Sequence, residues 1–289
     1  TWTWVSGNDT RDKPGIYGTQ GVADPANVPG ARDCSISWTD AGGNFWLFGG
    51  CGLDDTINYG DLNDLWRFNV SDATWTWVSG NDTRDKPGIY GTQGVADPAN
   101  VPGARDCSIS WTDAGGNFWL FGGCGLDDTI NYGDLNDLWR FNVSDATWTW
   151  VSGNDTRDKP GIYGTQGVAD PANVPGARER SVSWTDAGDN FWLFGGGGYD
   201  NATNYGDLND LWRFNVSDAT WTWVSGNYSL YNKGIYGTLG VADPANVPGA
   251  RELSASWTDA SSNLWLFGGY GIDNVSFDGD LNDLWKYTP

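Results

Sequence analysis

The chain has 289 residues, a net charge of −21 and no histidine. The negative charge argues against nucleic acid and anionic membrane surfaces as partners, since both would repel it. The lack of histidine removes the usual general base near neutral pH and the commonest transition-metal ligand. No apolar run approaches the ~20 residues that a membrane-spanning helix needs, so membrane insertion is not expected.

One segment of 73 residues is repeated four times, over residues 1–73, 74–146, 147–219 and 220–289. The first two copies are identical, the third differs at a few positions, and the fourth diverges further. Repetition at a fixed period is the signature of solenoids and propellers. We therefore expect residues 1–289 to form a single domain assembled from these four repeats.

Each repeat is predicted to hold four β-strands and no helix. In the first repeat the predicted strands are Cys34–Asp40, Phe45–Gly49, Asp64–Asn69 and Thr74–Val78. These segments alternate apolar and polar residues, or are rich in the Trp, Phe, Thr and Val that suit a pleated surface. The first two strands are joined through Gly42-Gly43, which indicates a two-residue hairpin turn.

Tandem four-stranded antiparallel repeats predict an all-β fold, a β-propeller of four blades. The chain starts with a fourth strand, Thr1–Val5, and ends with a third strand, Asp283–Tyr287. The opening segment is therefore predicted to complete the last blade. Closure of this kind would hide the edge strands, which otherwise invite aggregation.

The strand motif resembles the kelch repeat. An apolar strand ends in a glycine pair, Asp-Leu-Trp-Arg-Phe follows, and a tryptophan lies seven residues after the phenylalanine. The glycine pairs are Gly49-Gly50, Gly122-Gly123, Gly195-Gly196 and Gly268-Gly269. The aromatic residues on the third strand are Phe68, Phe141, Phe214 and Tyr287. The fourth-strand tryptophans are Trp75, Trp148 and Trp221, with Trp2 serving the last blade. The repeat is longer than the ~50 residues of a kelch repeat, because the connection between blades is long.

The resemblance implies a scaffold for interactions and carries no activity. Kelch-like folds include copper radical oxidases similar to galactose oxidase, but those enzymes need histidine ligands, which this chain lacks. From this we expect a protein that is not an enzyme.

Two cysteines flank the hairpin in each of the first two repeats: Cys34 and Cys51, then Cys107 and Cys124. A two-residue Gly42-Gly43 turn would place Cys34 opposite Cys51, with Cα atoms about 4.5 Å apart, which lies within disulfide range. The later repeats replace both members together, by Arg180 with Gly197 and by Leu253 with Tyr270. We predict two disulfides, and with them an oxidising compartment. Free thiols are the alternative, and zinc is poorly served by two cysteines per repeat without histidine.

Nine Asn-X-Ser/Thr sequons fall in the chain: Asn8, Asn69, Asn81, Asn142, Asn154, Asn201, Asn215, Asn227 and Asn274. They lie in predicted surface connections, where acceptors of N-linked glycans must lie. Chance in a chain rich in Asn and Thr is the alternative. Together with the predicted disulfides, the sequons indicate a secreted glycoprotein.

The loop between the second and third strands is rich in oxygen donors of the kind that Ca²⁺ prefers. The candidate ligands are Asp54, Asp61, Asp127, Asp134, Asp200, Asp207, Asp273 and Asp280. Their spacing does not match an EF-hand. The favoured alternative is that these residues cap turns around glycines.

In the predicted propeller, the long loops within and between the repeats all emerge on one face. Tyr17, Asp24 and Arg32, with their copies, lie on this face and would suit a carbohydrate. The favoured alternative is that the tyrosine packs on the fold and the arginine pairs with an acid. We expect an extracellular module that binds protein or glycan through this face. One alternative is a filament or coat subunit in which copies of the chain exchange strands. A glycan-active hydrolase is disfavoured, because tuning a carboxyl pKa needs an asymmetric pocket.

Overall fold

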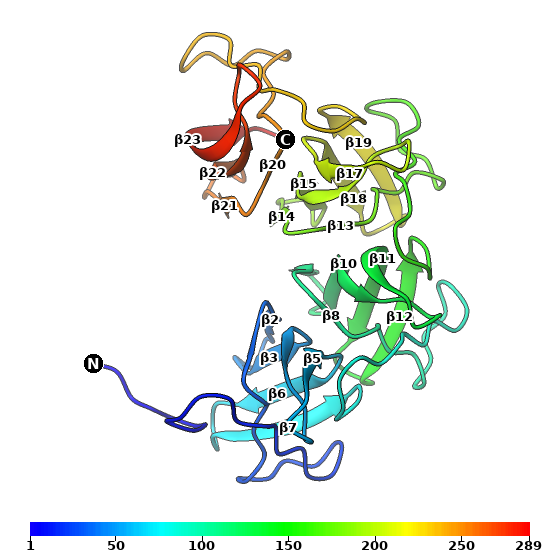
Figure 1. The fold of residues 1–289 in the computed structure, drawn as a ribbon, viewed down its shortest axis with the longest axis vertical. Coiled ribbons are helices and arrows are strands. Elements are labelled where there is room, and N and C mark those ends of the chain that lie inside the picture. The colour runs from blue at the N-terminus through cyan, green and yellow to red at the C-terminus, as the bar shows by residue number, and fades with distance from the viewer. The chain divides into compact units, whose positions relative to one another are not determined.

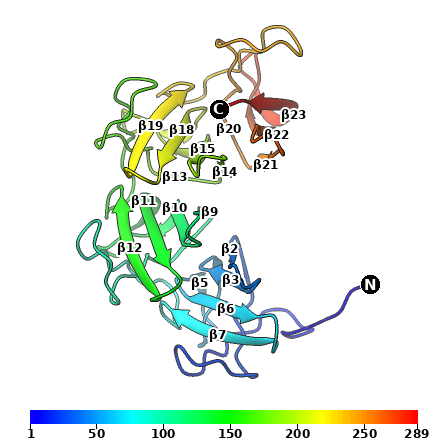
Figure 2. The same cartoon turned by 180° about the vertical axis from the view of Figure 1, so that it is seen from behind.

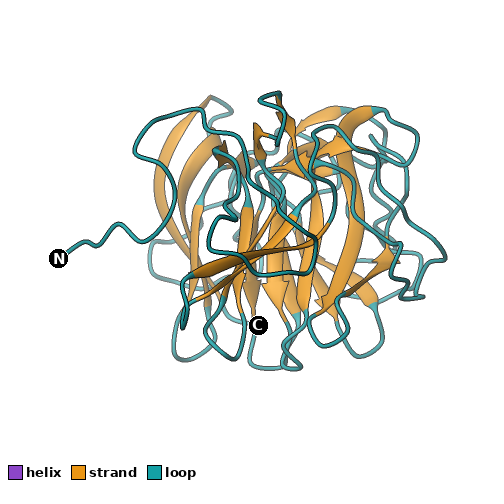
Figure 3. Cartoon of the chain, turned by 90° about the horizontal axis from the view of Figure 1, so that it is seen from below, coloured by secondary structure: helices purple, strands orange, loops and turns teal.

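The computed structural model describes residues 1–289, and every regular element in it is a β-strand (Figure 3). The prediction of an all-β chain without helices is confirmed, and no helix is available to cross a membrane. Contacts divide the chain into two compact units. The first unit spans Thr1–Gly133, Leu138–Val151 and Asp155–Arg157, and the second spans Asp134–Asp137, Ser152–Asn154 and Asp158–Pro289. The first unit holds repeat one and most of repeat two, and the second holds most of repeat three and all of repeat four. A single domain of four repeats stays a prediction.

The predicted four-stranded antiparallel sheet is present in the first and third repeats (Figures 1 and 2). In the first repeat the order is β2 (Ile36–Thr39), β3 (Phe45–Phe48), β6 (Leu65–Asn69) and β7 (Thr74–Ser79). In the third it is β14 (Val182–Thr185), β15 (Phe191–Phe194), β18 (Leu211–Asn215) and β19 (Thr220–Ser225). Aromatic and β-branched residues alternate on these strands, as the sequence pattern predicts.

A second, smaller sheet in these repeats was not predicted. It consists of β1 (Arg32–Asp33), β4 (Cys51–Leu53) and β5 (Tyr59–Asp61) in the first repeat, and of β13 (Arg178–Glu179), β16 (Gly197–Tyr199) and β17 (Tyr205–Asp207) in the third. The glycine pair separates the two sheets. Gly49 and Gly50 have φ angles of 60° and 91°, and a Cβ on Gly50 would collide with the hydroxyl of Ser35. Only glycine permits this turn at such close approach.

In the second and fourth repeats, long strands run through both sheets. The second repeat has the order β12 (Thr147–Ser152), β11 (Tyr132–Asn142), β10 (Phe118–Leu126) and β8 (Arg105–Asp106), with β9 (Ile109–Thr112) also on β10. The fourth consists of β20 (Arg251–Glu252), β21 (Ala255–Thr258), β22 (Leu264–Ile272) and β23 (Asp278–Tyr287). Strand β23 pairs with β22 and has no fourth strand beside it.

The prediction that Thr1–Val5 forms a closing strand is wrong for this structure. The segment has no strand assignment, Trp2 is fully exposed, and Trp4 is 67% exposed. The same residues, Thr-Trp-Thr-Trp-Val-Ser, form β7 at Thr74–Ser79 by pairing with β6. The same six residues therefore form a strand where they pair with a third strand, as β7 does with β6.

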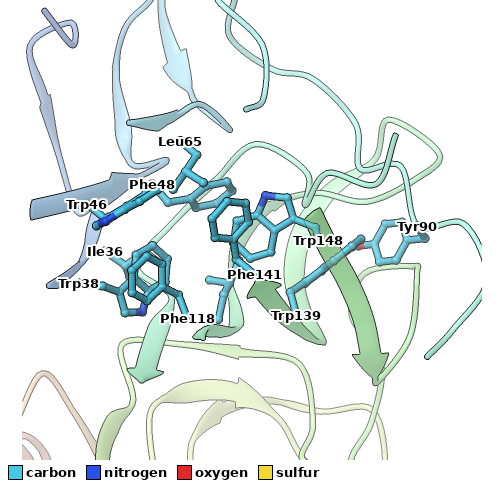
Figure 4. Close-up of a cluster of buried hydrophobic side chains, with 11 residues drawn as sticks. Ile36, Trp38, Trp46, Phe48, Leu65, Tyr90, Phe118, Trp139, Phe141 and Trp148 are labelled. Atoms are coloured by element: carbon cyan, nitrogen blue, oxygen red, sulfur yellow. The ribbon is translucent and has the colours of Figure 1, made fainter. Parts of the chain in front are cut away.

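Aromatic rings fill the space between the two repeats of each unit. In the first unit, Trp38 stacks on Phe118 with ring centroids 5.1 Å apart and planes at 9° (Figure 4). The Trp38 indole also donates to the carbonyl of Trp111 at 3.1 Å. In the second unit, the Trp184 indole donates to the carbonyl of Trp265 at 3.0 Å. These tryptophans pack repeat against repeat, so they are not a platform for ligands.

Candidate functional site

A buried ion pair supports the small sheet. In the third repeat, Arg178 donates to both oxygens of Asp210, at 2.7 and 2.8 Å, and both side chains are at most 1% exposed. Tyr163 Oη donates to the same carboxylate at 2.7 Å. Arg178 Nη1 also donates to the carbonyl of Gly195 at 3.1 Å. This bond ties the short strand β13 to the glycine pair and so fixes the position of the following residue, Glu179.

The residues proposed above for carbohydrate binding belong to this support in the first repeat. Arg32 pairs with Asp64 at 2.6 Å, and Tyr17 Oη donates to Asp64 at 2.6 Å. Burial and the charge of Asp64 raise the pKa of Tyr17 far above its usual range. Asp24 accepts a hydrogen bond from the amide of Ala26 at 2.8 Å. Tyr17 and Arg32 are therefore buried in the framework, as the favoured alternative had it.

The aspartates of the calcium prediction occupy two kinds of environment. Asp54 accepts bonds from the amides of Thr56 at 2.8 Å and Asn58 at 3.0 Å. Burial alone would raise the pKa of Asp54, but these hydrogen bonds outweigh it and lower the value. Asp61 lies instead on the small sheet, in a cluster that does not include Asp54. Asp54 therefore caps its loop by accepting main-chain amides, and calcium binding stays a prediction.

The cysteine register was predicted wrongly by one residue. The hairpin loop has three residues, because Asp40 pairs with Asn44 through an amide–carbonyl bond of 3.1 Å. Gly43 completes the loop with a φ of 78°. As a result Asp33, not Cys34, lies opposite Cys51. In the second repeat Asp106 likewise lies opposite Cys124. The four cysteines form no disulfide in this structure, and the two disulfides stay a prediction.

The sequons also divide into two groups. Six are exposed: Asn8, Asn81, Asn154, Asn201, Asn227 and Asn274. Three are half-buried: Asn69, Asn142 and Asn215. Asn69 accepts a bond from the amide of Ser71 at 3.0 Å, and its side-chain amide donates to Asp72 at 3.0 Å. The half-buried group therefore stabilises a tight turn, and glycosylation at any of the nine stays a prediction.

Acidic residues meet where the third repeat adjoins the fourth, within the second unit. We call the cluster of Arg180, Tyr205, Asp207 and Glu252 the third-to-fourth junction. Tyr205 and Asp207 lie on β17, Glu252 lies on β20, and Arg180 follows β13. The amide of Leu253 donates to the carbonyl of Arg180 at 3.1 Å, which holds β20 against the third repeat.

The acidic residues at this junction differ in the charges that surround them. Arg180 Nη1 lies 3.6 Å from Glu252 Oε1, and Arg180 Nε lies 3.6 Å from Glu179 Oε2. Burial, followed by the charges of Glu252 and Asp278, raises the pKa of Asp207 to about 6. Two nearby carboxyl groups thus have different surroundings: Glu252 faces a guanidinium, and Asp207 is held towards its neutral form.

Glycine at position 197 lets the backbone approach Glu252 and Tyr205 closely. A Cβ on Gly197 would lie 3.1 Å from Glu252 Oε2 and 3.2 Å from Tyr205 Oη. Burial, with the charges of Asp134 and Glu179, raises the pKa of Tyr205 above its usual range, so its hydroxyl stays protonated. A protonated carboxyl group beside an ionised one is the pairing that glycoside hydrolysis uses.

The same positions of the first two repeats form a different cluster, within the first unit. We call Cys34, Cys51, Asp61, Asp106 and Cys107 the first-to-second junction. One ligand atom from each of Cys51, Asp61 and Asp106 lies within 4.8 Å of the others, and the same holds for Cys34, Asp106 and Cys107. Burial and the charge of Asp106 raise the pKa of Asp61 to about 7.

The residues of the third-to-fourth junction were largely missed from the sequence. Only Asp207 was singled out, and as a calcium ligand. One signal was present: the chain has only two glutamates, Glu179 and Glu252, and each directly follows a buried arginine. Their meeting with Asp207 depends on contact between repeats, which the strand pattern of one repeat does not describe.

Comparison with known proteins gives partial matches. No family model matches the chain. A xyloglucanase from Paenibacillus sp. is 28% identical over 231 residues, covering 78% of this chain and 20% of that protein. The flagellar outer-arm dynein alpha chain of Chlamydomonas reinhardtii is 25% identical over 251 residues, covering 81% and 5%. Human multiple epidermal growth factor-like domains protein 8 is 26% identical over 226 residues, covering 78% and 6%. The chain thus spans a fifth or less of the length of these relatives.

Among solved structures, that of YjhT matches with a TM-score of 0.53 and 14% identity, over 86% of this chain and 62% of that one. This likeness supports a β-propeller-like fold. The expectation of a non-enzymatic binding module is corrected by the xyloglucanase match, which favours the hydrolase alternative.

Proposed function

We propose that the chain is a glycan-active hydrolase module with its acid pair at the third-to-fourth junction. The observation that carries the proposal is the similarity to a xyloglucanase along 78% of the chain. The junction supports it, because Asp207 has a pKa raised to about 6 beside a second carboxylate. Sequence reasoning disfavoured hydrolysis because near-identical repeats offer no asymmetric pocket. Arg180 and Glu252 provide that asymmetry, since the first two repeats have cysteine and aspartate at these positions.

The two acids take different roles in this proposal. Asp207, neutral at mildly acidic pH, donates a proton to the oxygen of the scissile glycosidic bond. Glu252, which lies 3.6 Å from Arg180, stabilises positive charge on the sugar ring or activates the attacking water. Tyr205 keeps its proton and offers a hydrogen bond to a sugar hydroxyl.

We also propose that the four repeats form four blades of one kelch-type propeller in a secreted protein. The antiparallel sheets within each repeat and the packing of repeat on repeat within each unit support this arrangement. The six exposed sequons fit secretion.

Release of reducing ends from xyloglucan and a panel of other polysaccharides tests the proposed function. The full chain should release them, and Asp207→Asn and Glu252→Gln should each lower kcat by about 100-fold or more, since each removes one participant in proton transfer or charge stabilisation. Asp280→Asn is the matched control. Asp280 occupies the same position in the fourth repeat and lies outside the third-to-fourth junction.

The control should keep full activity, and circular dichroism should show all three variants folded. Activity that survives Asp207→Asn unchanged would contradict the assigned acid. Absence of hydrolysis on every polysaccharide, with the chain folded, would contradict the proposed function itself.

A further inference from the structure

The two junctions have the same backbone but differ in what faces their acids. At the third-to-fourth junction, the guanidinium of Arg180 lies between Glu179 and Glu252, 3.6 Å from each. At the first-to-second junction, the residue equivalent to Arg180 is Cys34, and the residue equivalent to Leu253 is Cys107. The position that supplies a cation in one unit therefore supplies thiols in the other.

The backbone holds the two thiols side by side. The amide of Cys107 donates to the carbonyl of Cys34 at 3.1 Å. Both residues have left-handed φ angles, 49° for Cys34 and 51° for Cys107. Their sulfur atoms and a carboxylate oxygen of Asp106 all lie within 4.8 Å of one another. One donor thus comes from the first repeat and two from the second.

A second observation at this junction points to a cation. Asp61 is only 4% exposed, and its Oδ2 has no hydrogen-bond partner. Cys51 and Tyr132 hydrogen-bond to the Asp61 carboxyl group, but a buried oxygen atom without a partner is unfavourable because it has lost its contact with water. Asp61 lies with Cys51 and Asp106 in a second group of donors within 4.8 Å of one another. Asp106 belongs to both groups.

We propose that the first-to-second junction binds a divalent metal ion of the zinc type through Cys34, Cys107 and Asp106, whose ligand atoms lie within 4.8 Å of one another, with Asp61 close by in its own group with Asp106. Zinc takes four ligands in a tetrahedron and accepts thiolates and carboxylates. Calcium and magnesium prefer oxygen alone, so the sulfur atoms argue against them. On binding, each thiol loses its proton to solvent and forms a sulfur–metal bond, so no oxidant is needed.

This inference goes beyond the proposed function and does not depend on it. From the sequence, two cysteines per repeat were judged too few for a zinc site. The junction combines donors from two repeats, so the number of cysteines within one repeat does not decide whether zinc can bind. A disulfide between Cys34 and Cys107 would use both sulfur atoms but would leave the buried Oδ2 of Asp61 without a partner.

Titration of the reduced, metal-free full chain with Co²⁺ tests the site. Thiolate ligands to Co²⁺ give a charge-transfer band in the near ultraviolet, which Zn²⁺ should abolish by displacement. We expect saturation at one equivalent per chain. Asp61→Asn should weaken Co²⁺ binding about tenfold or more, in line with the loss of a group close to a metal.

Two further variants keep the test independent of folding. Cys34→Arg with Cys107→Leu places in the first unit the residues that the second unit carries, so the fold is retained and the band should vanish. Arg180→Cys with Leu253→Cys should create a second thiolate band in the second unit. A band that persists in the first variant would overturn the proposal. So would the absence of any band, or peptide mapping that finds Cys34 and Cys107 joined as a disulfide in the purified protein.

Discussion

Arg180 lies 3.6 Å from Glu252 at the third-to-fourth junction, whereas the equivalent residue of the first-to-second junction, Cys34, lies beside Asp106. The backbone is the same in both, since Cys107 donates to Cys34 and Leu253 donates to Arg180 over 3.1 Å. A shared frame thus carries two chemistries. In a chain of near-copies, the few side chains that differ between repeats mark where function can differ.

Substitution of the buried arginine–aspartate pair that supports each junction should cause the largest loss of stability. Asp210→Ala leaves Arg178 buried without its counter-charge, which should destabilise the chain by about 3–5 kcal/mol. Asp64→Ala should have the same effect in the first unit, because both carboxylates are fully buried. Asp283→Ala should have a smaller effect, since that side chain is 15% exposed. Urea denaturation followed by tryptophan fluorescence measures all three.

Asp218→Ala is the control for the ion pairs. Asp218 caps an exposed turn through the amide of Thr220 at 3.1 Å, so its loss should cost roughly 1 kcal/mol. Equal losses for Asp210→Ala and Asp218→Ala would show that the buried pair is not the support of the junction.

Substitution in the glycine pair should cause an intermediate loss of stability. It also tests whether this pair positions the acidic residues. Gly196 has a φ of 96°, and a Cβ there would collide with Ser181 and the backbone of Glu179. Gly196→Ala should therefore destabilise by about 2–3 kcal/mol and displace Glu179, through both strain and overpacking. Gly167 has a φ of 80° with open space around it, so Gly167→Ala should cost only about 1 kcal/mol. The difference in thermal unfolding midpoint between the two variants measures the destabilisation caused by the steric clash at Gly196. Equal midpoints would show that this clash does not contribute.

The smallest and most local expected effect is the dependence of folding stability on pH through Asp207. The pKa of Asp207 rises from 3.8 to about 6 on folding, so the folded chain binds more protons than the unfolded chain between these values. Stability should therefore fall as pH rises from about 4 to about 6 and then level off. Asp207→Asn should remove this part of the fall, and Asp280→Asn should not. Chemical denaturation across this range compares the variants with the wild type, and identical slopes in all three would contradict the raised pKa.

The strands were predictable because each repeat has its own strong pattern. Apolar alternation and β-branched residues located β2, β3, β6 and β7 closely, and the absence of helical periodicity was informative. The hairpin register was not predictable from Gly42-Gly43, because a glycine pair fits both two-residue and three-residue loops. Asp40 decides between them, since its carboxylate accepts the amides of Gly42 and Asn44, each at 2.9 Å.

The candidate site was less accessible to sequence reasoning. Its acids come from different repeats, so their proximity follows from how repeats pack, not from spacing within one repeat. The short strands β4 and β5, which place Cys51 and Asp61, lie in glycine-rich segments that resemble loops. What the sequence did reveal was substitution in pairs: Cys34 with Cys51, replaced by Arg180 with Gly197. That signal was interpreted as a disulfide, whereas the structure places these positions around the acids of the neighbouring repeat.

NMR titration of the side-chain carboxyl carbon of Asp207 measures whether this residue keeps its proton at mildly acidic pH. Aspartate labelled with ¹³C at the carboxyl group would be incorporated, and the Asp207 signal identified as the one missing from Asp207→Asn. The account predicts a midpoint near 6 for this signal, shifted towards lower pH in Glu252→Gln because a neighbouring negative charge is removed. A midpoint near 4 in the wild type would contradict the account, since the junction would then hold two ordinary carboxylates with no acid poised to donate a proton.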